Sequence, residues 1–244
     1  MPRRSRAGIS HVVFHVLNRA VQGVTLFESG QEYARFLEIV VATIRRAPMR
    51  LLAYTVMPNH WHLVLWPDRD QDLALFMKLL TGIHAQEWRR LNGTTGRGAV
   101  YQGRYKAIAV QQDAHFLRLC RYVERNAVRA KLVASAQDWL WTSASMGTGG
   151  PERPALTPWP VRRPENWLEL LNTPEPPGAL NRLRSAIRAG RHYGTPSWRF
   201  RTAQQLRWPG GDRGPGRVWE AAPDDANAGH PDPRAITVLS SETR

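Results

Sequence analysis

The stretch MPNHWHLVLWP, residues 57–67, has the pattern of a short β-strand bounded by prolines. Proline belongs at the beginnings and edges of strands, so we expect the strand over residues 60–66. Side chains alternate across a strand, which places His60 and His62 on one face and Leu63 and Leu65 on the other. Two imidazoles about 6–7 Å apart on one strand face can converge on a single divalent cation. The alternative is a strand that merely carries two polar residues on an open face.

The composition indicates a polyanionic partner. The chain has 244 residues and a net charge of +14, with 34 Lys and Arg against 20 Asp and Glu. Cys120 is the single cysteine, which excludes an intramolecular disulfide and fits a reducing compartment. No apolar run in the sequence approaches the roughly 18 residues of a membrane helix. We therefore expect a soluble, cytoplasmic and nucleoid-associated protein that does not bind membranes.

A change of composition predicts a boundary near residue 147. Beyond it Pro, Gly and Trp become frequent and long apolar periodicity disappears. We expect a main domain over residues 1–146 and a Trp-, Arg- and Pro-rich appendage over residues 147–208. Residues 209–244 offer little to bury and are expected to be disordered.

Hydrophobic periodicity predicts the order β-α-β-β-α-β-α. The expected strands span residues 9–17, 51–56, 60–66 and 105–110, and the expected helices span residues 28–45, 70–91 and 113–130. The first six elements have the order of the ferredoxin-like split βαβ fold, an α+β antiparallel sheet with helices on one face. The other face is then open, and His60 and His62 are expected to point to it.

The predicted third helix has three faces at about 100° per residue. Its apolar face should pack on the core and comprises Phe116, Cys120, Val123 and Ala127. Its basic face lies roughly opposite and comprises Arg118, Arg121, Arg125 and Arg129. Tyr122 and Asn126, one turn apart, lie at the margin between the two faces. Taken alone, Tyr122 is more simply interpreted as a boundary residue on a solvated, Arg-rich helix.

Together with the histidine pair, this helix suggests phosphodiester chemistry. Such a reaction needs the phosphate oxygens neutralised and a nucleophile in line with the leaving oxygen. Two imidazoles and an amide oxygen leave open metal positions for a phosphate oxygen. A phenol near positive charge can attack phosphorus and form a covalent intermediate, while the arginines hold the DNA backbone.

Several motifs together resemble the single-tyrosine (Y1) transposases of the HUH endonuclease superfamily, and most closely the REP-associated tyrosine transposases. They are MPNHWHL at 57–63, RYVERNAVRA at 121–130, FHVLNR at 14–19, YQGRYK at 101–106, and RHYGT at 191–195 with Trp198. The resemblance spans residues 8–208 and identifies residues 1–146 as the catalytic domain.

The resemblance implies a metal-dependent nickase and strand transferase of single-stranded DNA. His60, His62 and Asn126 would bind Mg²⁺ or Mn²⁺, and Tyr122 would form a 5′-phosphotyrosine link and release a 3′-hydroxyl. The implied substrate lies beside a DNA hairpin, as in repetitive extragenic palindromes. We expect a monomer, with a dimer as the alternative.

Residues expected to contact DNA are mostly basic or aromatic. In the main domain they are Arg19, Arg104, Lys106, Arg118, Arg121, Arg125 and Arg129. In the appendage they are Arg184, Arg188, Arg191, His192, Tyr193 and Trp198. Short helices are expected over residues 181–189 and 197–207. Aromatic rings with interleaved arginines suit unpaired bases, but the tryptophans can equally fasten the appendage to the core.

Three alternatives remain open at this point. A regulator on the same scaffold can bind hairpin DNA or RNA without cutting it, although it would not need the His, Tyr and Asn set. A zinc hydrolase is weaker, because no third ligand follows at metalloprotease spacing. Tyr105 is a rival nucleophile, but it is expected on a strand, so it does not share a helix with Asn126 as Tyr122 does.

Overall fold

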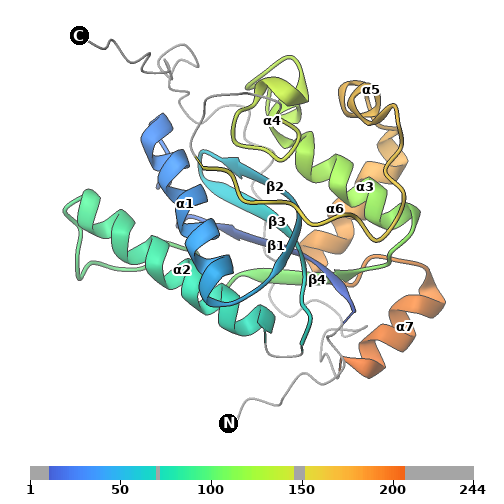
Figure 1. Ribbon diagram of the computed structural model, residues 1–244, viewed down its shortest axis with the longest axis horizontal. Helices are drawn as coiled ribbons and strands as arrows, with labels where there is room; N and C mark the ends of the chain where they lie inside the picture. The colour runs from blue at the N-terminus through green and yellow to red at the C-terminus, as the bar shows by residue number, and fades with distance from the viewer. Residues whose placement is uncertain (1–10, 70–71, 146–151, 207–244) are drawn as a thin grey trace.

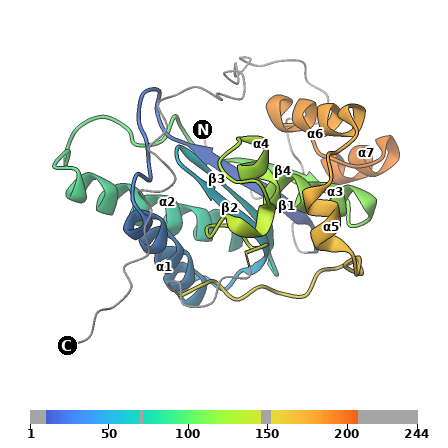
Figure 2. The same ribbon diagram turned by 90° about the horizontal axis from the view of Figure 1, so that it is seen from above.

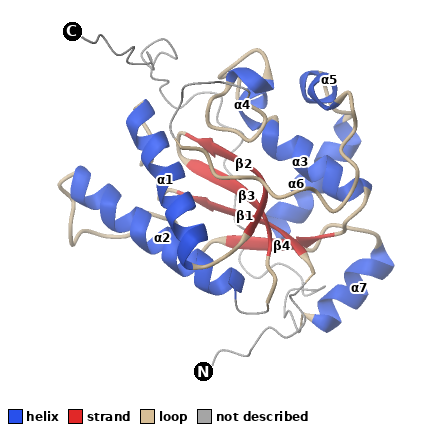
Figure 3. Ribbon diagram, viewed as in Figure 1, coloured by secondary structure: helices blue, strands red, loops and turns tan. Residues whose placement is uncertain are grey.

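A computed structural model describes residues 11–69, 72–145 and 152–206. Its centre is a four-stranded antiparallel sheet in the order β2-β3-β1-β4 (Figures 1 and 3). The strands are β1 (Val13–Arg19), β2 (Arg50–Met57), β3 (His60–Trp66) and β4 (Lys106–Val110). Strand order and direction confirm the α+β, ferredoxin-like fold.

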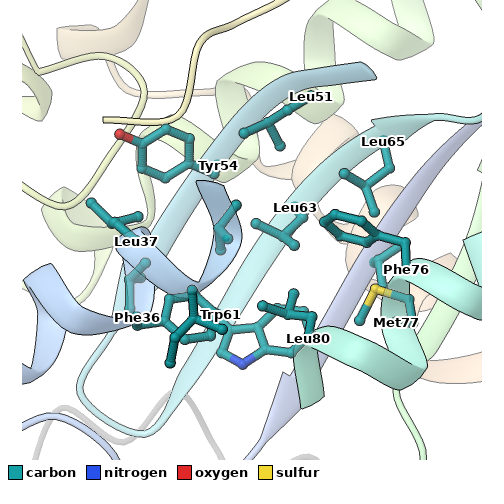
Figure 4. Packing of buried hydrophobic residues seen from close by; sticks show 14 of the residues in the cluster. Phe36, Leu37, Leu51, Tyr54, Trp61, Leu63, Leu65, Phe76, Met77 and Leu80 are labelled. Atoms are coloured by element: carbon teal, nitrogen blue, oxygen red, sulfur yellow. The ribbon is translucent and has the colours of Figure 1, made fainter. Parts of the chain in front are cut away.

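Two long helices cover one face of the sheet. They are α1 (Gly30–Arg46), capped by Ser29 and Glu32, and α2 (Asp72–Leu91). Trp61, Leu63 and Leu65 of β3 face these helices and pack with Phe36 and Phe76 (Figure 4). All five side chains are fully buried, which fixes the facing of β3 because a slip of one residue would turn them outward.

The opposite face is covered rather than open, which corrects the expectation of helices on one face only. A second apolar cluster joins Val64 and Ile108 of the sheet to Phe116 and Cys120 of α3 (Ala114–Glu124). The appendage helices α5 (Trp167–Asn172) and α6 (Pro177–Ala189) add Leu171, Leu183 and Ile187 to this cluster. Figure 2 shows α1 and α2 on one side of the sheet and α3, α5 and α6 on the other.

Both edges of the sheet carry extra hydrogen-bonded chain. Along β2, the carbonyl of Trp141 accepts from the N–H of Val56, and the N–H of Ser143 donates to Tyr54. Along β4, Tyr193 pairs in parallel with Val110 and donates to the carbonyl of Ala109. These contacts cover edges that would otherwise expose unpaired backbone groups.

The predicted third helix is interrupted. The backbone of Arg125 (φ −88°, ψ 4°) makes a turn between α3 and the short helix α4 (Asn126–Arg129). A single helical wheel over residues 113–130 therefore fails beyond Glu124. Phe116, Cys120, Val123 and Ala127 are buried as expected, but Arg125 is also buried instead of lying on an exposed face.

The appendage packs on the second apolar cluster through its tryptophans. Trp159 donates to the carbonyl of Leu52 and meets the rings of Phe116 and Trp167 edge to face. The buried Trp167 donates to the Glu124 carboxylate at 2.7 Å. The expected domain boundary falls at residues 146–151 and the expected tail at 209–244, both outside the described residues. Within the described residues, no helix has the length and apolar character needed to cross a membrane.

We expect Glu124→Ala to lower the free energy of unfolding by about 1–3 kcal/mol, because it leaves the buried Trp167 N–H without an acceptor. Glu124 also accepts from Ser143 at 2.6 Å. Burial raises the pKa of this carboxyl. The contribution of Glu124 to the free energy of unfolding is therefore fully present below the pKa that this carboxyl has in the unfolded chain. The contribution is lost as the pH rises through the higher pKa of the folded state.

Urea unfolding of wild type, Glu124→Ala and Glu124→Gln across acidic and neutral pH measures both effects. Glutamine keeps an acceptor but does not ionise, so wild type should lose stability relative to it as the pH rises. Equal unfolding free energies for wild type and Glu124→Ala would contradict the role of Glu124 in holding the appendage.

Candidate active site

His60 and His62 lie side by side on the sheet face that α3 covers. Their ring centroids are 5.1 Å apart with an interplanar angle of 88°. Trp61, between them, points to the other face, where its indole N–H donates to the hydroxyl of Tyr101. The alternation predicted from the sequence is confirmed, and the buried Trp61 holds the strand from behind.

Each of these histidines uses its Nδ1 atom in a hydrogen bond. His60 Nδ1 lies 2.7 Å from Oδ1 of Asn59. His62 Nδ1 lies 2.8 Å from Nε2 of His15, a buried residue of β1. Among the described residues no hydrogen bond reaches Nε2 of either His60 or His62. These two atoms are the ones left for a ligand.

Both histidines are neutral at neutral pH. Desolvation, followed by the charges of Arg19 and Arg129, lowers the pKa of His60 to about 3. The pKa of His62 lies well below its ordinary value, first through desolvation and then through His15, His60 and the same two arginines. Neutral imidazoles offer a lone pair to a metal ion.

Tyr122 meets this pair from α3. Its ring contacts His62 at a centroid distance of 5.8 Å and His15 at 6.3 Å, both edge to face. The guanidinium carbon of Arg129 lies 4.1 Å from the centre of the Tyr122 ring. Tyr122, which follows His62 by about 60 residues in the sequence, thus lies beside the histidine pair with a positive charge over its ring.

Asn126 begins α4, directly after the turn at Arg125, and its side chain is buried. Within the described parts of the chain, no hydrogen bond joins Asn126 to His60 or His62. Its role as a third ligand stays a prediction. The turn separates Asn126 from the regular helix of Tyr122, so their relative placement is not that of a continuous α-helix.

The chemistry of these side chains fits a divalent cation. Among the described residues, no group of three or more His, Cys, Asp or Glu side chains is placed to hold a metal ion. A site here therefore depends on His60, His62 and an oxygen donor such as the Asn126 amide. Such an incomplete nitrogen and oxygen set leaves positions open for a phosphate oxygen or water.

The basic residues of the main domain differ in their position relative to the histidine pair. Arg19 is the cross-strand partner of His60, and Lys106 lies two strands from His62 in the row Lys106–Leu17–His62. Arg104 and Arg118 are exposed. Arg121 donates to the carbonyl of Thr173 at 2.7 Å, which joins α3 to the appendage.

Several appendage residues that are expected to contact DNA lie where the appendage meets β4. His192 is buried, and its Nδ1 accepts from the N–H of Ala109 at 3.2 Å. Tyr193 is buried beside β4. A Cβ added to Gly194 would lie 2.5 Å from the ring of Trp198, so only glycine allows this approach. Residues 192–194 thus fasten the appendage to β4, whereas Arg188 and Arg191 are exposed.

The sequence alone did not assign His15 or Asn59 to the site. His15 lies on the same face of β1 as Leu17 and Arg19, but the register of β1 against β3 decides which residue of β3 it meets. Asn59 precedes His60 directly, and its position beside a candidate ligand is a local signal that could have identified it.

Fold and site together define a protein with a histidine pair and a tyrosine on one face of a ferredoxin-like sheet. Residues 8–126 match the family model described as "Transposase IS200 like". This segment contains His15, His60, His62, Tyr122 and Asn126. This match confirms the resemblance to the single-tyrosine transposases over residues 8–126.

A solved structure is also similar, the "Structure of the REP associates tyrosine transposase bound to a REP hairpin". The similarity covers 64% of this chain and 98% of that one, with 16% sequence identity and a TM-score of 0.46. A search of curated proteins finds no significant match.

Proposed function

We propose that this protein is a metal-dependent single-stranded DNA endonuclease and strand transferase that cuts beside hairpins through Tyr122. The observation that carries the proposal is the contact of Tyr122 with His62 under the guanidinium of Arg129. A purely structural tyrosine would not need two neutral histidines beside it whose Nε2 atoms no described residue engages.

His60, His62 and Asn126 would hold Mg²⁺ or Mn²⁺ in this site. When bound, such an ion neutralises a phosphate oxygen and makes phosphorus more susceptible to attack. The protein itself supplies the remaining positive charge, since Arg19 and Arg129 are the cationic side chains that act on both histidines. The site therefore attracts a phosphodiester.

Tyr122 would act as the nucleophile. Its hydroxyl oxygen bonds to phosphorus as the bond from phosphorus to the 3′ oxygen breaks. The phenol loses its proton, and the departing oxygen gains one and becomes a free 3′-hydroxyl. The guanidinium of Arg129, whose central carbon lies 4.1 Å from the centre of the ring, would stabilise negative charge that develops on the phenol.

The rival nucleophile, Tyr105, lies on the wrong face of the sheet. It directly precedes β4 and packs with the apolar cluster under α1 and α2. Lys106, the next residue, has the opposite facing and lies in the same cross-strand row as His62. This arrangement supports Tyr122.

The end of α6 provides a path for DNA away from the site. The ammonium of Lys106 donates to the carbonyl of Arg188 at 3.5 Å. Two strand spacings, about 10 Å in total, separate Lys106 from His62 along the sheet. The exposed Arg188 and Arg191 therefore lie next to the edge of the histidine face, and we propose that they hold the DNA backbone.

We expect the double variant Arg188→Gln/Arg191→Gln to bind single-stranded hairpin DNA more weakly and with less dependence on salt. Removing one phosphate–arginine ion pair should reduce the slope of log K against log salt by about 0.7. Fluorescence anisotropy at several salt concentrations measures this slope. Arg46→Gln/Arg90→Gln removes two exposed charges from the ends of α1 and α2 and is the matched control. Equal slopes for the two double variants would exclude a specific role for α6.

The proposed activity is tested with an end-labelled single strand that carries a hairpin, incubated with the protein and Mn²⁺. We expect a cleaved strand and a protein–DNA adduct that survives denaturation. Tight hairpin binding with neither cleavage nor adduct at any metal concentration would instead favour a non-cleaving DNA- or RNA-binding regulator.

A further inference from the structure

His15 is a buried histidine that touches both parts of the candidate site. It lies on β1, and its side chain has no exposed surface. Its Nε2 atom is 2.8 Å from Nδ1 of His62, and the two rings are nearly parallel, with centroids 5.0 Å apart and an interplanar angle of 13°. The ring of Tyr122 meets its edge.

The fold itself does not explain a histidine at position 15. The flanking residues Phe14 and Val16 are fully buried and belong to the core. Nδ1 of His15 is buried and has no hydrogen-bond partner among the described residues. A buried polar atom without a partner destabilises a protein, so an apolar side chain would suit the interior better. What His15 does offer is its other nitrogen, which faces His62.

The contact between His15 and His62 bears on which nitrogen of His62 can bind a metal. His15 Nε2 and His62 Nδ1 lie 2.8 Å apart in one hydrogen bond, so one of these two nitrogens donates the proton and the other accepts it. If His15 Nε2 donates, His62 carries its own proton on Nε2 and cannot bind a metal there. If His62 Nδ1 donates, its Nε2 lone pair is available, which parallels His60 with its Nδ1 against Asn59.

We propose that His15 is a positioning residue for His62: its Nε2 accepts the Nδ1 proton of His62 and so presents the Nε2 lone pair of His62 to the cation. The hydrogen bond between the two nearly parallel rings fixes the orientation of His62 as well as its tautomer. The inference rests on the proposed function, since it assigns His62 as a metal ligand. Partners of this kind typically change metal affinity by about 10–100-fold when removed.

The test compares Mn²⁺ binding to the full chain, without DNA, in three variants. His15→Phe fills a similar space but cannot accept a proton, and we expect its Mn²⁺ dissociation constant to rise about 10–100-fold. His15→Gln retains an acceptor and should recover most of the affinity. His115→Phe removes a histidine that is bonded to Asp113 on α3 and should bind Mn²⁺ like wild type. Isothermal titration calorimetry gives the affinities, and thermal unfolding shows whether each variant is folded.

Nitrogen chemical shifts of ¹⁵N-labelled histidine provide a second readout, because they report which ring nitrogen of His62 carries the proton. If His15 only filled space, its replacement would not change these shifts. We expect the His62 proton on Nδ1 in wild type and His15→Gln, and a shift toward Nε2 in His15→Phe. Undiminished Mn²⁺ affinity in folded His15→Phe would overturn the proposal. If that variant does not fold, a wild-type His62 that carries its proton on Nε2 in the presence of Mn²⁺ would overturn it. Absence of Mn²⁺ binding in wild type would contradict the proposed metal site, while the wild-type tautomer would still report on His15.

Discussion

Alanine at both His60 and His62 should reduce cleavage of single-stranded DNA at least about a thousandfold, because the cation's stabilisation of the phosphate is worth several kcal/mol. Both histidines are neutral, so the substitution removes no charge that attracts DNA. Hairpin affinity should therefore remain within a few-fold of wild type. Cleavage rates at several Mn²⁺ concentrations and anisotropy titrations with the hairpin measure the two quantities.

The single variant His115→Gln is the matched control for the loss of an imidazole elsewhere. His115 lies at the start of α3 and bonds to Asp113. It should cleave at the wild-type rate. Undiminished metal-dependent cleavage by the His60→Ala/His62→Ala variant would remove both histidines from the metal site.

Tyr122→Phe should abolish the covalent adduct and lower cleavage at least about a thousandfold, since it removes the nucleophilic oxygen itself. The change deletes one oxygen and keeps the ring that packs against His62, His15 and the guanidinium of Arg129. Fold, Mn²⁺ affinity and hairpin affinity should therefore persist. Denaturing gels with end-labelled DNA measure adduct and product together.

Tyr105→Phe serves as the control for Tyr122→Phe, because it removes a phenol oxygen on the other side of the sheet. We expect it to form the adduct normally. An adduct that survives Tyr122→Phe but disappears in Tyr105→Phe would transfer the role of nucleophile to Tyr105.

The facing of β3 is predictable because it depends only on local alternation. Leu63 and Leu65 turn to the core, so His60 and His62 must turn away from it. The apolar face of α3 is likewise a local property. Phe116, Cys120 and Val123 recur at helical spacing and are all buried.

The partners of the site residues depend on contacts far apart in the sequence, which local patterns do not encode. His15 reaches His62 only because β1 pairs with β3 in one particular register. The burial of His192 and Tyr193 depends on the edge of β4, about 80 residues earlier. The covered second face has the same origin, because the short appendage helices are stabilised by packing rather than by their own periodicity.

The most direct test of covalent catalysis by Tyr122 is to identify the residue attached to DNA. Trypsin cleaves after Arg121 and Arg125, so it releases Tyr122 in the peptide Tyr122-Val123-Glu124-Arg125, whereas Tyr105 falls between Arg104 and Lys106. The adduct formed with Mn²⁺ and hairpin DNA is digested with trypsin and nuclease and analysed by tandem mass spectrometry. We predict a nucleotide phosphate on Tyr122 in the 122–125 peptide. A phosphate on any other residue, with the 122–125 peptide unmodified, would contradict the account.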